Sequence, residues 1–320
     1  LSTKHKKNDS NNVIEKYADE FFDEFLGKKR PHSESTSMHK KDDNEKQKLS
    51  SKQKGDSKNN NNHSNNKNEK SKEEIEKYQN RLNGFLSKKD IHSLLKKYPM
   101  QYGQDLNVTK YCKNGNGEMQ RITLDLLPDP QQQSDEEDIE YIVAESKDVW
   151  ANYDDGCSVR LLCPHKYNDR VYALLSSLEL EFGCMVGANA YLTPGPERDN
   201  ISSHQGFAPH YDDIEAFVLQ LEGYKHWKVY PPMSKGEVLP RESSRDYTLK
   251  EIEEVQPVID VILGPGDILY MPRGWIHQAN TPKMSQIRDM VNNGEKESIN
   301  ENHSLHLTVS IMQNWSWVDL

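Results

Sequence analysis

The sequence has no Cys-x-x-Cys spacing, no apolar run near the roughly twenty residues that span a bilayer, and no hydrophobic signal core at its start. These absences argue against zinc-ribbon, membrane-spanning and secreted proteins. The four cysteines are scattered among apolar residues, at Cys112, Cys157, Cys163 and Cys184. We expect reduced, mostly buried thiols in an intracellular protein.

Positive charge is outnumbered by negative charge, with 41 Lys and Arg residues against 51 Asp and Glu residues. The net charge of −10 opposes a dominant electrostatic attraction to nucleic acid, so we expect no direct nucleic-acid binding. Two basic clusters, Lys28-Lys29-Arg30 and Lys40-Lys41, stand out against this background. Such clusters can assist nuclear import.

Large apolar side chains are almost missing from residues 33 to 74. This polar segment cannot bury enough surface to offset its chain entropy, so we expect a disordered, low-complexity insert. Residues 1 to 32 precede it, and here Val13, Tyr17, Phe21 and Phe25 recur at helical spacing. We expect an N-terminal helix followed by a basic segment.

Residues 75 to 156 are expected to form the helical and mixed N-terminal part of the main folded domain. Helices are predicted at 75–86 and 89–97, with Ser87 as the cap of the second. A polar and acidic stretch at 128–138 is expected to be a solvated loop.

Residues 157 to 320 are dominated by short strands, with one predicted helix at 169–182. Strands are predicted at 158–162, 185–192, 216–221, 224–230, 257–263, 266–271 and 305–311. Along the last strand, polar side chains at 306, 308 and 310 alternate with apolar ones, which predicts a polar interior and an apolar outer shell. The fold class is therefore mainly β with flanking helices, a double-stranded β-helix barrel of the cupin or jelly-roll kind.

His210 and Asp212 lie two residues apart on an extended segment, so their side chains point the same way. His277 follows a hydrophobic strand and a tight Pro-Arg-Gly turn. Two histidines and one carboxylate form the facial triad of non-haem Fe(II) oxygenases, which leaves positions open for co-substrate and oxygen. The same spacing recurs at His32-Ser33-Glu34, but in a polar run without strand character. We therefore predict that His210, Asp212 and His277 are the catalytic metal ligands.

Several segments, together with this triad, carry a resemblance to a known family. They are Cys157 to Pro164, Ala190 to Pro194, Gln205 to Gly223, Pro272 to His277 and Ser304 to Thr308. In these segments the chain resembles the JmjC-type 2-oxoglutarate oxygenases, and among them the ribosomal oxygenases of nucleolar histidyl-hydroxylase type, also described as bifunctional lysine demethylases. The resemblance spans about residues 78 to 320. It implies a JmjC barrel with Fe(II) as the cofactor and 2-oxoglutarate and O2 as co-substrates, in a protein of the nucleus and within it the nucleolus.

The resemblance also implies roles for individual residues. Lys225 and Thr308 would bind 2-oxoglutarate, Lys225 through the distal carboxylate. The substrate would be bound by Arg160, Asn189, Tyr191 and Ser310. The implied reaction is hydroxylation at the Cβ of a histidine in a large-subunit ribosomal protein, while 2-oxoglutarate is oxidised to succinate and carbon dioxide. An alternative is that Asn189 and Tyr191 merely satisfy one another in the core.

Three alternative functions stay open. A histone methyl-lysine demethylase, acting as a chromatin regulator, would use the same chemistry, although Asn189, Tyr191 and Ser310 suit a neutral imidazole better. A scaffold that binds ribosomal or chromatin proteins without turnover is opposed by the intact triad. A zinc or manganese cupin isomerase would carry an extra His and Glu where this chain has Tyr211 and Asp213.

Three stretches depart from the family pattern as insertions, at 33–74, 195–204 and 283–302, and the last two flank the expected active-site mouth. The chain begins at Leu1 without Met and ends at Leu320, where the family continues into a helical dimerisation region and a winged-helix domain. We expect a piece of a longer protein whose parent is a homodimer.

Overall fold

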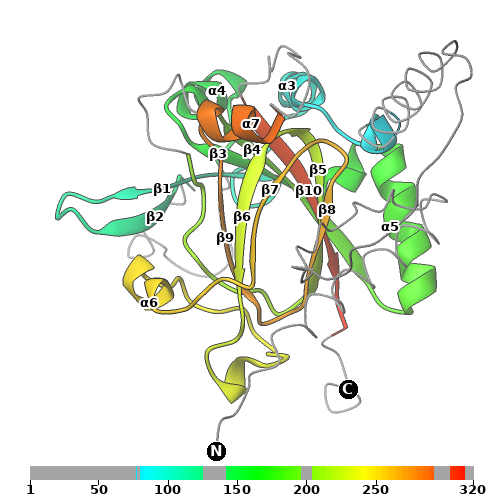
Figure 1. The fold of residues 1–320 in the computed structure, drawn as a ribbon. Coiled ribbons are helices and arrows are strands. Elements are labelled where there is room, and N and C mark those ends of the chain that lie inside the picture. Colours follow the sequence, from blue (N-terminus) through cyan, green and yellow to red (C-terminus); the bar gives the residue numbers. More distant parts are fainter. Residues whose placement is uncertain (1–76, 78–79, 125–141, 196–203, 292–302, 314–320) are drawn as a thin grey trace, which may run out of the picture.

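The computed structural model describes residues 77, 80–124, 142–195, 204–291 and 303–313 (Figure 1). The predicted N-terminal helix, the insert at 33–74 and the acidic loop at 128–138 lie outside the described residues. Of the two later insertions, only residues 195, 204 and 283–291 are described.

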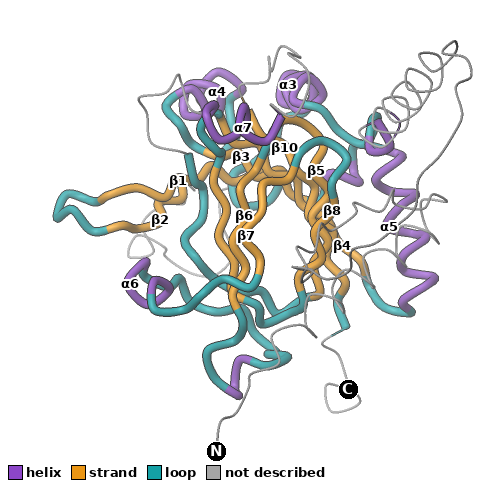
Figure 2. Tube along the Cα trace, in the orientation of Figure 1, coloured by secondary structure: helices purple, strands orange, loops and turns teal. Residues whose placement is uncertain are grey.

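Two antiparallel β-sheets form the body of the molecule. The larger sheet has the strand order β2-β1-β3-β4-β10-β5-β8, and the smaller one has the order β7-β6-β9. The strands are β1 (Leu106–Lys113), β2 (Met119–Thr123), β3 (Ser158–Leu162), β4 (Val186–Pro194), β5 (Glu215–Gly223), β6 (Lys225–Tyr230), β7 (Ile259–Leu263), β8 (Ile268–Met271), β9 (Ile276–Asn280) and β10 (His303–Ile311). Figure 2 shows these strands in the centre, with the helices around them.

Helices lie around the two sheets (Figure 2). They are α3 (Lys88–Lys97), α4 (Ser146–Asp154), α5 (Asp169–Phe182), α6 (Leu249–Glu253) and α7 (Met284–Val291), with short 3-10 turns at Asn80–Leu82, Pro164–Lys166 and Lys235–Glu237. Helices α4 and α5 pack on the larger sheet, and α6 packs beside β6 and β9 of the smaller one. Helix α3 begins at the predicted cap, where the Ser87 hydroxyl accepts from the Asp90 N–H and the Asp90 carboxylate accepts from the Ser87 N–H. Helix α5 begins after Asn168 and ends at Gly183. Both helices confirm the sequence prediction.

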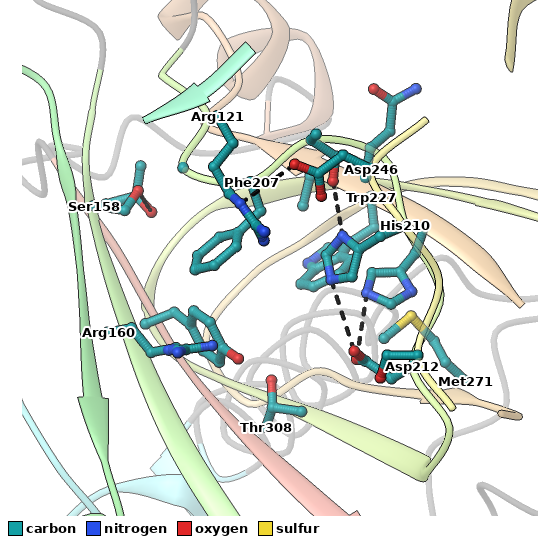
Figure 3. A pocket seen from close by; sticks show the side chains of 18 of the residues that line it. Arg121, Ser158, Arg160, Phe207, His210, Asp212, Trp227, Asp246, Met271 and Thr308 are labelled. Carbon is teal, nitrogen blue, oxygen red and sulfur yellow. Dashed lines mark hydrogen bonds and ion pairs between the residues drawn. The ribbon is translucent and has the colours of Figure 1, made fainter. Parts of the chain in front are cut away.

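The alternation along β10 separates the core from the barrel interior. Leu305, Leu307, Val309 and Ile311 belong to the main hydrophobic core, which lies between the larger sheet and the helices. A second core, which includes Val218, Trp227, Val229 and Leu269, fills part of the space between the two sheets. His306 and Thr308 point into the remaining space (Figure 3 shows Thr308). The predicted two-sheet barrel with a partly polar interior is confirmed.

Three strands and three helices were not predicted. Strand β1 carries Asn107 and Lys110 among its apolar residues, and β2 is exposed along most of its length, so neither shows a strong period-two pattern. Nevertheless β1 pairs with both β2 and β3, so part of the segment 75–156 belongs to the same sheet as the barrel strands. Helices α4, α6 and α7 are short. In the segment 75–86, Lys77 is helical and Asn80–Leu82 form a 3-10 turn, while residues 75, 76, 78 and 79 lie outside the described residues.

Two further expectations concern cysteines and membranes. All four cysteines are free thiols, but only Cys157 is fully buried; Cys112, Cys163 and Cys184 are half-buried. The expectation of mostly buried thiols is thus too strong. In the part of the chain that the structure describes, no helix has the length and apolarity to cross a membrane.

Candidate metal centre and co-substrate cavity

The backbone places two of the predicted metal ligands opposite one another. His210 lies just before β5 and His277 lies within β9, and the two residues form an antiparallel bridge. The His277 N–H donates to the His210 carbonyl at 2.8 Å, and the His210 N–H donates to the His277 carbonyl at 3.2 Å. This bridge brings together residues that are far apart in the sequence.

Hydrogen bonds orient both imidazoles. The Nδ1 of His210 lies 2.7 Å from the Ala208 carbonyl oxygen, and the Nδ1 of His277 lies 3.1 Å from that of Trp275. A carbonyl only accepts, so each Nδ1 carries a proton and Nε2 is the ring nitrogen available to a metal ion. Burial, and then the neighbouring His210, lower the pKa of His277 to about 4, which keeps this imidazole neutral.

Asp212 completes the cluster. Its Oδ1 lies 3.8 Å from the His210 Nε2, and its Oδ2 lies 3.7 Å from the His277 Nε2. One ligand atom from each of the three residues lies within 4.8 Å of the others. Two imidazoles and one carboxylate therefore converge on a single point, as a facial triad requires (Figure 3).

The turn before His277 is fixed by a glycine. Gly274 has a φ of +84°, and a Cβ at this position would lie 2.1 Å from the Glu237 carbonyl oxygen. Its N–H donates to the Asp212 carbonyl at 2.9 Å. The Pro-Arg-Gly turn thus ties the strand that carries His277 to the backbone of the third ligand.

The triad opens into a cavity of about 290 Å³ between the two sheets. Most of the deeper lining residues are polar or aromatic. They include Ser158, Tyr191, Thr193, Lys225, Trp227, His306 and Thr308. Near the entrance lie Arg121, Phe207 and the segment 243–246.

Lys225 is a buried cation in this cavity. Its side chain comes from β6, the residue is 3% exposed, and its Nζ donates to the Thr193 hydroxyl at 2.9 Å. It has no ion-pair partner among the described residues, and burial lowers its pKa to about 7. Burying an unpaired ammonium is costly, so the site is suited to an incoming carboxylate. Thr308, the other predicted co-substrate residue, lines the same cavity.

The predicted substrate residues are placed unevenly. Arg160 and Tyr191 line the cavity, whereas Asn189 and Ser310 are not among its lining residues, although they lie on the inward faces of β4 and β10. Tyr191 stacks on His306, with ring centroids 4.9 Å apart, and it has hydrogen bonds to Arg160 and Asn189. Tyr191 therefore does more than satisfy Asn189.

Sequence reasoning missed several lining residues. His306 was assigned only to the polar face of its strand, yet it is buried beside Lys225 and its Nδ1 has no hydrogen-bond partner among the described residues. Phe207 lies one residue after Gly206 in the segment that resembles the family, but nothing in its immediate pattern marks it. Arg121 and Asp246 come from a weak strand and a loop. The sequence assigns no role to His165, His204 and His226, and these three histidines do not line the cavity.

A metal-binding triad inside a two-sheet barrel defines the protein as a cupin-fold metalloprotein. Within that class, residues 160–291 match the family model of the JmjC domain, and the chain belongs to the JmjC-domain proteins.

Curated proteins with similar sequences carry names from the same family. Two proteins named bifunctional lysine-specific demethylase and histidyl-hydroxylase NO66 are similar to this chain. The one from Culex quinquefasciatus is 42% identical over 73% of this chain and 29% of its own length. The one from Dictyostelium discoideum is 40% identical over 75% of this chain and 38% of its own length. Human ribosomal oxygenase 1 is 39% identical over 74% of this chain and 30% of its own length. The matched part of the chain thus spans only 29% to 38% of the length of each of these relatives.

Among solved structures, the Escherichia coli ribosomal oxygenase YcfD aligns with 71% of this chain and 44% of its own, at 16% identity and a TM-score of 0.38.

Proposed function

We propose that this chain is the catalytic part of an Fe(II)- and 2-oxoglutarate-dependent protein hydroxylase. The observation that carries the proposal is the pairing of a His-Asp-His triad with a buried, unpaired lysine in one cavity. The triad suits iron because its donors are two imidazoles and one carboxylate. The lysine suits the distal carboxylate of a dianionic co-substrate.

Different residues of the chain would bind the metal and the co-substrate. His210, Asp212 and His277 would hold the metal, and bound Fe(II) would supply the activation of O2 coupled to oxidation of 2-oxoglutarate to succinate and carbon dioxide. Lys225 would bind the distal carboxylate, next to the hydroxyls of Thr193 and Thr308. A substrate C–H bond becomes C–OH, with one oxygen atom of O2 in the product and the other in succinate.

We infer that the substrate side chain is a histidine of a large-subunit ribosomal protein, hydroxylated at Cβ. The names of the relatives support this class of reaction. Arg160, Asn189, Tyr191 and Ser310 remain the proposed substrate contacts, through the hydrogen-bonding groups on the inward side of the barrel.

Demethylation of a histone methyl-lysine is the second candidate, because the names of the same relatives include it. A methylated ammonium favours free aromatic faces. Here Tyr191 stacks on His306, and the Phe207 ring lies 5.9 Å from the Arg121 guanidinium and 5.7 Å from that of Arg160. These occupied faces favour the histidine substrate.

One experiment separates the candidates. A histidine-containing ribosomal-protein peptide and a trimethyl-lysine histone peptide are incubated together with the metal-loaded, full-length protein, 2-oxoglutarate and air, and then weighed by mass spectrometry. Gain of one oxygen on the ribosomal peptide alone, lost in Asp212→Ala, supports the proposal. Loss of a methyl group from the histone peptide would favour the demethylase, and no succinate formation at all would favour a scaffold without turnover.

The parent protein is proposed to be a nuclear, nucleolar homodimer. The proposal rests on the resemblance to the family, because the predicted import clusters lie outside the described residues. Light scattering of the full-length protein measures the oligomeric state. Imaging of a fluorescent fusion, with and without Lys28-Lys29-Arg30, measures the location.

A further inference from the structure

An ion pair spans the entrance of the cavity. Arg121, from the β1–β2 hairpin, reaches Asp246, from the loop between β6 and β7, with Nε and Oδ2 3.3 Å apart. Both residues line the cavity, and the Arg121 guanidinium lies over the ring of Phe207 (Figure 3). The pair therefore lies beside the same cavity as the metal triad, where a bound substrate polypeptide could reach it.

The two partners are not equally fixed. The loop that carries Asp246 is bonded to the backbone that carries the metal ligands. The Tyr247 N–H donates to the Pro209 carbonyl at 2.8 Å, and the Ser244 N–H donates to the Tyr211 carbonyl at 3.0 Å. The Ser244 hydroxyl accepts from the Tyr211 N–H at 2.9 Å, and Tyr247 is buried in a small core. The carboxylate of Asp246 therefore has a fixed place relative to His210 and Asp212.

Arg121 is less firmly fixed in position than Asp246. Its strand is exposed, and the hairpin projects from the body of the molecule (Figure 1). Its side chain is 37% exposed and that of Asp246 is 34% exposed, so solvent screens the pair. The other entrance arginine, Arg245, is paired with Glu251 instead. Arg121 is thus the exchangeable partner of a carboxylate that is held in position.

We propose that Asp246 is a specificity-determining residue whose carboxylate binds a lysine or arginine of the substrate polypeptide, close in sequence to the oxidised residue. Before the substrate binds, this carboxylate forms its ion pair with Arg121. This inference rests on the proposed function. The excess of negative charge on the chain favours a basic polypeptide as partner.

The test uses a set of otherwise identical histidine-centred peptides, with Arg, Gln or Glu placed in turn at each of the neighbouring positions. KM and kcat for hydroxylation are measured with the full-length, iron-loaded protein. Binding of the same peptides to the Mn(II)- and 2-oxoglutarate-loaded protein is measured by fluorescence anisotropy, which needs no turnover. Wild type is expected to prefer Arg over Gln at one position by about tenfold in KM, because a charge-assisted hydrogen bond is gained.

The two entrance variants should act in opposite directions. Asp246→Asn removes the preference for Arg, whereas Arg121→Gln lowers KM for the Arg peptide because the competing cation is gone. Asp260→Asn is the matched control, since Asp260 is an ion-paired aspartate on β7 outside the cavity. A purely structural ion pair would instead make both entrance variants worse alike for every peptide, and that result overturns the inference.

Failure of the inference and of the proposed function remain distinguishable. Hydroxylation of all peptides regardless of neighbouring charge, in wild type and Asp246→Asn alike, overturns the inference and leaves the function intact. Charge-selective binding that is lost in Asp246→Asn, without hydroxylation of any peptide, supports the inference and overturns the function.

Discussion

His210 and His277 exchange both of their backbone hydrogen bonds, so the approach to β5 and the middle of β9 are locked in register at the metal site. Each imidazole is oriented in turn by a backbone carbonyl two residues before it, Ala208 or Trp275. The positions of two ligands are therefore set by main-chain geometry and do not depend on a bound ion. The backbone of Asp212 is tied to the turn before His277, because its carbonyl accepts a hydrogen bond from the Gly274 N–H.

Asp212→Ala should abolish succinate formation and weaken metal binding strongly, while the fold is retained. The Asp212 side chain is 34% exposed and its backbone is held by the hydrogen bond from Gly274, so its truncation should leave the packing of the cores largely intact. Metal content after dialysis, 2-oxoglutarate turnover and the melting temperature are the measurements. Asp260→Ala serves as the control. Retention of turnover in Asp212→Ala would mean that another residue supplies the carboxylate.

Gly274→Ala should damage both stability and metal affinity. The new Cβ meets the Glu237 carbonyl at 2.1 Å and the backbone lies in the left-handed region, so the turn must shift. We expect a loss of roughly 1–3 kcal/mol in the free energy of unfolding, the cost of one such strained residue, measured by denaturant titration. Gly236→Ala is the matched control, because its Cβ would meet nothing closer than 3.8 Å. Equal effects of the two substitutions would contradict this account of the turn.

Neighbouring positions on β10 should separate stability from function. Leu307 is fully buried in the main core, and Leu307→Ala should cost about 2–5 kcal/mol in the free energy of unfolding.

Thr308 faces the cavity, and Thr308→Val keeps the shape and the β-branch but removes the hydroxyl. The expected result is a raised KM for 2-oxoglutarate with little change in melting temperature. An unchanged KM would remove Thr308 from the co-substrate site.

The sequence predicts the elements whose own residues determine them. Helix α5 and strand β10 show strong periodicity, and the metal triad combines a common His-x-Asp spacing with strand context and a second histidine after a tight turn, so all three can be found without the structure. The ion pair between Arg121 and Asp246 cannot be predicted from the sequence. Arg121 lies on a strand with a weak pattern and Asp246 lies in a loop, and their contact depends on how the hairpin and the loop are placed by the rest of the barrel. For a similar reason, the buried setting of His306 follows from its neighbours Tyr191 and Trp227 rather than from its own segment.

Lys225 should make 2-oxoglutarate binding dependent on pH near neutrality. Burial lowers the pKa of its ammonium from 10.5 to about 7 in the unliganded protein. Below this pH the lysine is charged and ready for a carboxylate, whereas above it the lysine must take up a proton on binding. The dissociation constant for 2-oxoglutarate should therefore rise as pH increases above 7, by up to about tenfold per pH unit. Calorimetry on the Mn(II)-loaded protein between pH 6 and 9 measures this, and Lys225→Arg, which stays charged, should give weaker but pH-independent binding.

The same shift has a consequence for the protein without ligand. Between pH 7 and 10.5 the unfolded chain binds more protons at Lys225 than the folded chain does, so the free energy of unfolding should rise with pH over this window. Lys225→Met removes the buried charge, and it should raise the melting temperature most at pH 6, where the folded wild type must hold an unpaired ammonium. It should also abolish 2-oxoglutarate binding. If Lys225→Met instead destabilised the protein at pH 6, the ammonium would have a stabilising partner in the unliganded cavity, and the lysine would not be waiting for a carboxylate.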